Sequence, residues 1–248
     1  MTYCVGLLLD AGLVMIADTR TNAGVDNFSS YVKLHALAQG PDRQVWLCTS
    51  GSLSMTQSIV SMLTESIAES QARSSTVAEA PSMFRVAQIV GQAVQEVNRS
   101  VGSALAEANV PGSVSLLLGG RVGDEPLSLF LIYSAGNFIE CTPESPFLQI
   151  GETKYGKPIL DRGVRHDTPL PDAVKVALLS FDSAMRSNLG VARPLDLVVI
   201  PADPEGAPLT RRIEPDDEYF NALSLRWAVL LHEATQSIPN PPFMEGRS

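Results

Sequence analysis

The sequence is poor in positive charge, in cysteine and in aromatic residues. Its 248 residues carry 18 Lys and Arg against 27 Asp and Glu, so the formal net charge is −9. A site for nucleic acid or for anionic lipid needs clustered positive charge, because both partners are polyanions. The composition therefore argues against nucleic acid and against a membrane surface as partners.

Signals for export or for membrane insertion are also absent. The three cysteines lie far apart without a CxxC pair, which argues against a disulfide framework or a zinc site and fits a reducing compartment. No basic segment precedes the first apolar run, so no signal peptide is predicted. The uncharged stretch 45–64 is rich in Ser, Thr, Gln and Gly, which is too polar for a membrane span. We expect a soluble, cytoplasmic protein.

Motifs of the commoner enzyme classes are missing as well. The chain has no phosphate-binding GxxxxGK[ST], no dinucleotide-binding GxGxxG after a strand, no HExxH and no GxSxG. Its three histidines fall in different predicted elements and lack the spacing of metal ligands. We therefore predict neither a metal site nor a cofactor.

The pattern of apolar residues predicts both strands and helices. Strands are expected from alternating or continuous apolar runs at 3–9, 13–18, 31–37, 44–49, 113–118, 127–133, 137–141 and 195–200. Helices are expected from apolar residues at steps of three and four, beginning at Ser52 or Ser54 and running through Ile59, Leu63 and Ile67, then at 84–105, 171–187 and 216–235.

The order of these elements is strands, two helices, strands and further helices. That order predicts an α+β fold in which two sheets are sandwiched between helical layers. No linker, repeat or low-complexity segment divides the chain, so we expect a single domain over 1–248. Its proline-rich tail, about 238–248, is not expected to form regular structure.

The most informative residue is Thr2. If Met1 is removed, Thr2 becomes the amino terminus and carries a hydroxyl and a free α-amine together. A free α-amine titrates at about 7.7–8.0, so near neutral pH it can accept the proton of the neighbouring hydroxyl. One residue then supplies both the nucleophile and the base. A retained Met1 would block this chemistry.

Two charged residues are candidates to support Thr2. Asp18 ends one predicted strand, and Lys33 lies within the next. Alternation places four residues on one face of that strand: Tyr31, Lys33, His35 and Leu37. An amine in an apolar strand needs a counter-charge, for which Asp18 is a candidate, and a buried Lys33 would lower the pKa of a nearby amine. Alternatively, Lys33 is an exposed charge on an edge strand.

A fourth feature is the segment 48–52, Cys-Thr-Ser-Gly-Ser, where a strand runs into a helix. Backbone N–H groups at such a junction suit an oxyanion, and Gly51 permits a close approach by substrate.

Together these residues resemble a proteasome β-type subunit: Thr2 after a single Met, the strand Gly-Leu-Val-Met-Ile-Ala-Asp-Thr-Arg at 12–20, Lys33 in the next strand and the Thr-Ser-Gly turn at 49–51. The opening Met-Thr-Tyr-Cys-Val-Gly and the segment 17–27 resemble most closely the bacterial proteasome homologues called Anbu. The specific match covers roughly residues 1–65.

This resemblance implies an N-terminal-nucleophile hydrolase fold, which is a four-layer αββα sandwich, and subunits that assemble around a central chamber. It implies that Thr2 is the nucleophile, Asp18 and Lys33 its charged partners, and Gly51 the backbone donor to the oxyanion. The residues that it places along a bound peptide are Thr21, Asn22 and Thr49.

The carboxyl-terminal half departs from the proteasome pattern. Where the family has a Gly-Ser-Gly turn, this chain has Ile-Gly-Glu-Thr at 150–153. Where the family has Arg-Asp-x-x-Ser-Gly, this chain has Arg-Ser-Asn-Leu-Gly at 186–190. Candidates to replace the missing supporting residues are Thr153, Ser187 and Asn188. These departures bear on peptidase activity more than on the fold.

The sequence therefore favours a threonine peptidase that cleaves peptides or unfolded proteins within a homo-oligomer, either a ring or a helical stack. Two other functions stay open. One is an assembling scaffold whose site is weak or inactive, and the other is an amidohydrolase that acts on a small amide. Retention of Met1 without covalent capture at Thr2 would favour the scaffold.

Overall fold

The computed structural model describes residues 2–22, 28–68 and 76–244. The chain forms two units, Met1–Glu214 and Pro215–Ser248, which are described separately. The predictions about Met1 and about the last residues of the tail lie outside the described residues.

Two five-stranded antiparallel sheets form the centre of the first unit. The first has the order β10-β1-β2-β11-β12, with bounds β1 (Tyr3–Leu9), β2 (Gly12–Asp18), β10 (Phe147–Gly151), β11 (Leu195–Pro201) and β12 (Leu209–Ile213). The second has the order β5-β6-β7-β8-β9, with bounds β5 (Leu34–Gly40), β6 (Arg43–Gly51), β7 (Val114–Val122), β8 (Ser128–Tyr133) and β9 (Phe138–Glu140). A separate hairpin pairs β3 (Arg20–Asn22) with β4 (Phe28–Ser30).

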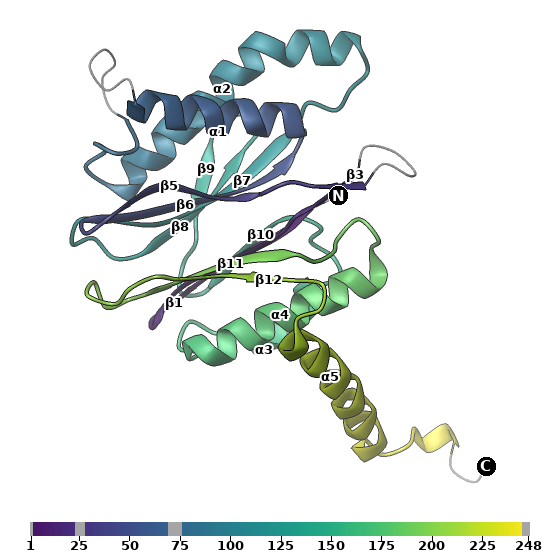
Figure 1. Ribbon diagram of the computed structural model, residues 1–248. Helices are drawn as coiled ribbons and strands as arrows, with labels where there is room; N and C mark the ends of the chain where they lie inside the picture. Colours follow the sequence, from purple (N-terminus) through teal and green to yellow (C-terminus); the bar gives the residue numbers. More distant parts are fainter. Residues whose placement is uncertain (1, 23–27, 69–75, 245–248) are drawn as a thin grey trace. The chain divides into compact units, whose positions relative to one another are not determined.

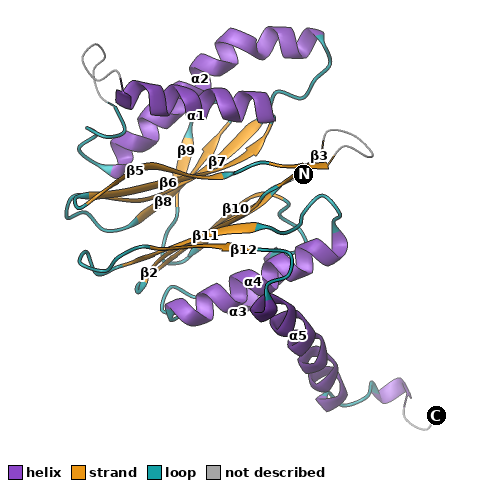
Figure 2. Cartoon of the chain, in the orientation of Figure 1, coloured by secondary structure: helices purple, strands orange, loops and turns teal. Residues whose placement is uncertain are grey.

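Helices cover the outer faces of these sheets. Figure 1 shows α1 (Leu53–Ala68) and α2 (Met83–Glu107) over the second sheet, and α3 (Lys157–Gly163) and α4 (Leu170–Ser187) against the first. The four layers are equally clear in Figure 2, where the orange sheets lie between purple helices. The predicted α+β fold with αββα layers is confirmed.

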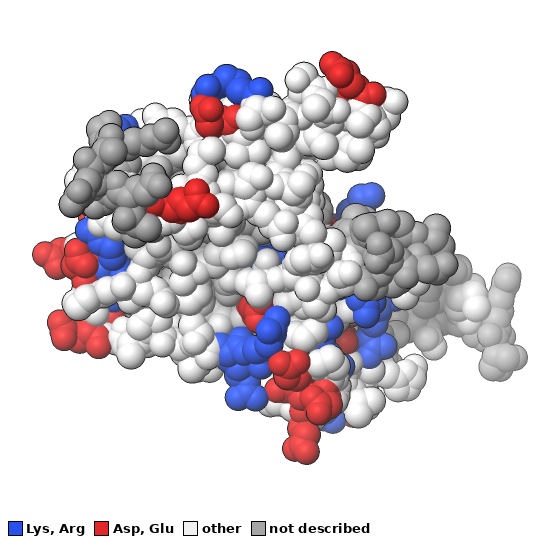
Figure 3. Space-filling model, turned by 45° about the horizontal axis from the view of Figure 1, so that its top comes forward, with Lys and Arg blue, Asp and Glu red and all other residues white. Residues whose placement is uncertain are grey.

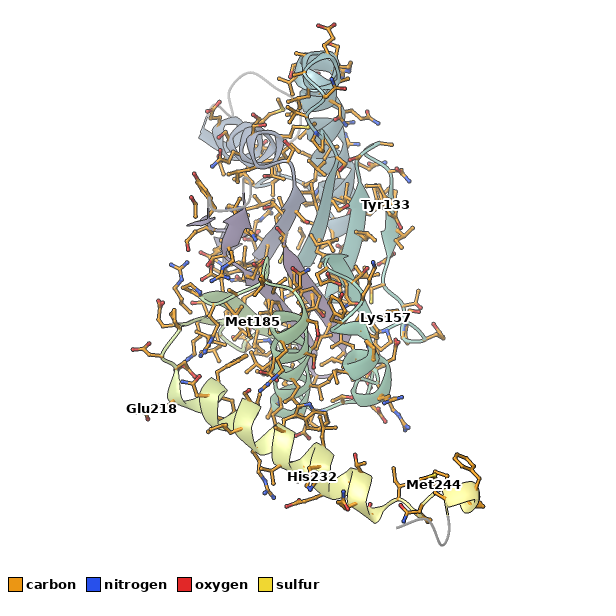
Figure 4. The ribbon with its side chains drawn as sticks, turned by 90° about the vertical axis from the view of Figure 1, so that its right-hand side faces the viewer. Tyr133, Lys157, Met185, Glu218, His232 and Met244 are labelled. Atoms are coloured by element: carbon orange, nitrogen blue, oxygen red, sulfur yellow. The ribbon has the colours of Figure 1, made fainter. Side chains whose placement is uncertain are left out.

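The alternation of side chains along a strand explains how the second sheet packs against a hydrophobic core on each of its faces. On β6, Val45 and Leu47 pack into the core beneath α1 and α2, whereas Trp46 and Cys48 face the core between the sheets. Successive side chains of a strand point to opposite faces, so a continuous apolar run suits a sheet that is buried on both sides. Figure 4 shows side chains filling the space between the layers.

The helices on the second sheet follow the predicted periodicity. Met55, Ile59 and Leu63 recur every four residues on α1 and are buried. The side chain of Ile67 lies outside the described residues. At the start of α2, the Ser82 side chain accepts a hydrogen bond from the backbone N–H of Arg85, as expected of a helix cap.

The prediction of a strand over 31–37 is partly wrong. β5 begins at Leu34, so Lys33 precedes the strand, and the register shifts between Ala36 and Ala38. A bulge of this kind breaks the alternation of side chains. Leu37 packs into the helix-side core and Leu34 into the core between the sheets. Tyr31 and Lys33 precede the strand, so the predicted common face of Tyr31, Lys33, His35 and Leu37 does not form on one strand.

The sequence did not predict β10, β12 or α3. β10 and β12 have five residues each, and α3 has seven residues with a proline in its first turn. Such short segments carry little periodic signal.

The second unit contains α5 (Glu218–Ser237) and a short 3₁₀ helix, η1 (Pro242–Met244). In Figure 4, side chains project from α5 along its length, from Glu218 past His232. Many of its exposed side chains are apolar, including Leu225, which is 70% exposed.

The surface shows no basic stripe on the face visible in Figure 3, where Lys and Arg are interspersed with Asp and Glu. No helix in the described part of the chain is long and apolar enough to span a bilayer.

Candidate active site

A buried ion pair lies next to the amino terminus. The Lys33 Nζ lies 2.9 Å from the Asp18 Oδ1, and the two side chains are 5% and 0% exposed. The Lys33 amine also donates to the backbone carbonyl of Arg20. The structure therefore brings together the two charges that the sequence singled out, from the end of β2 and from the residue before β5.

The Asp18 carboxylate is buried slightly more completely than the Lys33 side chain. Burial raises the pKa of Asp18, and the neighbouring Lys33 ammonium acts in the opposite direction. The Asp18 Oδ1 accepts hydrogen bonds from Lys33 and from the backbone N–H of Tyr3, at 2.9 Å each. The Oδ2 has no partner among residues 2–22, 28–68 and 76–244.

Thr2 is held by backbone contacts. Its carbonyl accepts a 2.7 Å hydrogen bond from the backbone N–H of Glu152, and Thr2 is 8% exposed. A side chain at Gly151, where φ is +81°, would overlap that same carbonyl. Because Tyr3 is bound to Asp18, Thr2 lies one residue from the ion pair. The first residue of a processed chain would therefore have a fixed backbone.

Tyr3 anchors this terminus on its other side. Its hydroxyl lies 2.5 Å from the Ser180 Oγ and accepts a 2.6 Å hydrogen bond from the Gln149 Nε2. Its ring packs on Phe181, with centroids 4.4 Å apart. Burial raises the pKa of Tyr3 to about 12. Sequence reasoning missed this residue, because a buried tyrosine in a strand carries no signal of such contacts.

Gly51 and Thr49 lie at the end of β6. At Gly51 φ is +110°, and a Cβ there would overlap the Ser113 carbonyl, so the backbone requires glycine. Thr49 is buried, and its backbone N–H donates to the Lys33 carbonyl at 2.9 Å. Thr49 therefore helps to fix the segment that carries Lys33.

The two remaining predicted substrate contacts lie in the hairpin. Thr21 pairs with Ser29 and Asn22 with Phe28 in the β3–β4 ladder. Thr21 is half-buried, and the side chain of Asn22 lies outside the described residues. Both belong to the short strand that directly follows Asp18 and Thr19.

The three candidate supporting residues differ from one another. Asn188 approaches the site: its Nδ2 donates to the Glu152 Oε2 at 2.7 Å. Thr153 and Ser187 are exposed. Glu152 is 5% exposed, and its other carboxylate oxygen accepts a 2.8 Å hydrogen bond from the Lys154 backbone N–H. Sequence analysis proposed Asn188 as a supporting residue but not Glu152. Glu152 could have been found, because it lies in the turn where the chain departs from the Gly-Ser-Gly of the family.

Comparison with known proteins shows the family to which the chain belongs. The profile of a family described as "Proteasome subunit" matches residues 2–200. Solved structures of Anbu are similar over nearly the whole chain. The chain belongs to the Anbu group of the proteasome family.

Three of these Anbu structures give the extent of the similarity. Anbu from Hyphomicrobium sp. strain MC1 is 44% identical, with a TM-score of 0.88, covering 96% of this chain and 99% of that one. Anbu (ancestral beta-subunit) from Yersinia bercovieri is 39% identical, with a TM-score of 0.88 and coverages of 96% and 99%. The structure titled "Helical Assembly of the Anbu Complex from Pseudomonas aeruginosa" is 39% identical, with a TM-score of 0.90 and coverages of 98% and 100%. None of the curated proteins is a significant match.

Within the described ranges, no group of three or more His, Cys, Asp and Glu side chains is arranged to hold a metal ion.

Proposed function

We propose that this protein is a threonine-type amide hydrolase that cleaves peptide bonds, with Thr2 as its amino-terminal nucleophile. The observation that carries the proposal is the buried pair of Lys33 and Asp18, joined through the Tyr3 backbone to the residue that follows Met1. Membership of the proteasome family supports it, since that fold is built around an amino-terminal nucleophile.

The mechanism begins when Met1 is removed. The Thr2 Oγ attacks the carbonyl carbon of a peptide bond, and the Thr2 α-amine, directly or through a water, takes the hydroxyl proton. The Lys33 ammonium favours the neutral form of that amine and stabilises the developing negative charge at Oγ. The backbone N–H of Gly51 donates to the oxyanion. The protonated amine then gives its proton to the leaving amine, and water hydrolyses the ester on Thr2.

Homo-oligomer formation is the second part of the proposal. The Pseudomonas relative is described as a helical assembly. In this chain, α5 and the tail expose large apolar side chains, among them Leu225 and Ile238, which are 70% and 67% exposed. Exposed apolar surface of this kind is typical of a contact with another chain. Native mass spectrometry at micromolar concentration tests assembly, and a strict monomer contradicts it.

We place this activity in the cytoplasm. Supporting this, the three cysteines of the described residues are all unpaired, as is usual in a reducing compartment.

The scaffold function is the alternative, because the turns at Glu152 and Asn188 depart from the proteasome pattern. Intact mass spectrometry, before and after an electrophile that reacts with a hydroxyl and an α-amine together, separates the two. Capture at Thr2 supports the hydrolase, and a chain that begins at Thr2 without capture supports the scaffold. A screen with peptides and small amides then separates a peptidase from a small-amide hydrolase.

A further inference from the structure

Two buried thiols face the same core from opposite sheets. Cys4 on β1 and Cys48 on β6 are both 0% exposed, and neither is in a disulfide. Both belong to the core between the sheets, although the two strands belong to different sheets. Cα atoms of β1 and β6 come within 8 Å of each other, whereas packed sheets usually lie about 10 Å apart. These two strands therefore approach more closely than facing sheets usually do.

The two thiols also contact each other. Burial is the main cause that raises the pKa of Cys4, and its hydrogen bond with the Cys48 side chain adds to this effect. The Cys4 Sγ lies 3.8 Å from the carbonyl oxygen of Thr49, the residue that follows Cys48. A disulfide requires two sulfurs that can meet without a large movement of the backbone, and side chains already in contact fit this requirement.

The pair lies next to the candidate active site. Cys4 pairs in the β1–β2 ladder with Ala17, the residue before Asp18. The charges of Asp18 and Lys33 both act on the Cys4 thiol, Asp18 raising its pKa and Lys33 lowering it. A bond between Cys4 and Cys48 would therefore join two strands that both lead into the site.

The third cysteine provides a comparison within the same chain. Cys141 is 5% exposed, and burial raises its pKa to about 12. Its thiol donates to the Ser145 carbonyl at 2.8 Å rather than binding a second thiol. Cys141 thus resembles Cys4 in burial and in the direction of its pKa shift, but it differs in having a carbonyl as its contact.

We propose that Cys4 and Cys48 form a redox-sensitive pair, which closes to a disulfide under sustained exposure to hydrogen peroxide and links the strand that follows Thr2 to the strand that ends at Gly51. In a reducing compartment such a disulfide is transient, and reduction reopens it. The proposal does not depend on Thr2 being a nucleophile.

The chemistry takes place in two steps. The sulfur of one thiol attacks a peroxide oxygen and the O–O bond breaks, which yields a sulfenic acid and one water. The sulfur of the second thiol then attacks the sulfenic sulfur, its proton leaves with the hydroxyl group as a second water, and the S–S bond forms. Two thiols are oxidised and one peroxide is reduced to two waters. Because burial leaves little thiolate at Cys4, we expect the reaction to be slow.

The test counts free thiols by mass. The full chain, folded and reduced, is exposed to hydrogen peroxide at neutral pH, the peroxide is destroyed with catalase, and the protein is unfolded in N-ethylmaleimide. The unexposed chain should take up three labels. The exposed chain should lose two hydrogen atoms and take up one label, at Cys141, and its digest should contain a peptide pair joined through Cys4 and Cys48. Dithiothreitol should restore all three labels.

Two variants and one condition serve as controls. Cys141→Ser should form the bridge at the same rate as the wild type. Cys48→Ser should form no bridge between Cys4 and Cys141. In urea, where the fold no longer selects the partners, bridges that include Cys141 should appear. Retention of all three labels in the folded wild type, or the same mixture of bridges in the folded and the urea-treated chain, overturns the inference.

Discussion

The two sides of the candidate site differ in whether their buried carboxylate is paired with a cation. On the β2–β5 side, Asp18 is matched by Lys33 in a buried ion pair. On the β10–α4 side, Glu152 has only the neutral donors Asn188 and Lys154 N–H among the described residues. The first side keeps the proteasome pattern in sequence and the second departs from it. We therefore expect the proposed chemistry of Thr2 to depend more on the first side than on the second.

The largest expected effect is on stability, when the ion pair is broken. Lys33→Ala leaves the Asp18 carboxylate buried without its cation, which should lower the free energy of unfolding by about 3–5 kcal/mol. Lys157→Ala removes an exposed lysine that pairs with Asp161 and should change stability by less than about 1 kcal/mol. Urea denaturation of both variants measures this. Similar values for the two would mean that Lys33 is an ordinary surface charge.

The next effect is on reactivity. Lys33→Arg keeps the charge but replaces a compact ammonium by a planar guanidinium, which cannot take the same place between Asp18 and the Arg20 carbonyl. We expect the same oligomer and a loss on the order of 10²-fold in the rate of electrophile capture at Thr2. The rate is followed by mass, with Lys157→Arg as the matched control. Equal rates for wild type and Lys33→Arg would remove Lys33 from the mechanism.

Tyr3 contacts both sides of the site, Asp18 through its backbone N–H and Ser180 through its hydroxyl. Its contribution to the stability of the protein depends on pH. Its folded pKa of about 12 lies above the usual value of 10.0. The resulting contribution to stability, about 2–3 kcal/mol, is therefore fully present below pH 10 and is lost as the pH rises through about 12. Tyr3→Phe should lack this alkaline loss. The measurement is the free energy of unfolding of both proteins between pH 8 and 12. If the wild-type values change with pH in parallel with those of Tyr3→Phe, the prediction is wrong.

The smallest effect is expected on the β10–α4 side. Asn188→Ala removes one hydrogen bond from Glu152 but leaves the bond from the Lys154 N–H, so it should destabilise the protein by about 1–3 kcal/mol. Capture at Thr2 should persist in this variant. Loss of capture as large as that in Lys33→Arg would show that the two sides contribute equally, and the comparison would fail.

Local pattern predicted the layers of the fold because β1, β2, α1, α2 and α4 have clear apolar periodicity. It could not predict the bulge between Ala36 and Ala38, since that irregularity arises from pairing with β6. Short elements such as β10 also depend on neighbours that are distant in the sequence.

The candidate site was predictable where single residues carry the signal. Thr2, Asp18 and Lys33 have unusual positions in the sequence, and the structure pairs Asp18 with Lys33 beside Tyr3, the residue that follows Thr2. Glu152 was not found, because a glutamate after a short strand is usually exposed, and its burial depends on Asn188 from the end of α4. Among the three named supporting residues, Asn188 donates a hydrogen bond to the Glu152 side chain, whereas Thr153 and Ser187 are exposed.

The central claim is that Thr2 acts as a free amino-terminal nucleophile, and intact mass spectrometry of the protein from its native cells tests it most directly. We predict a mass that lacks Met1, and a single adduct at Thr2 after exposure to an electrophile that bridges the hydroxyl and the α-amine. Complete retention of Met1 in an active fraction, or a chain that begins at Thr2 and forms no adduct, would contradict the account.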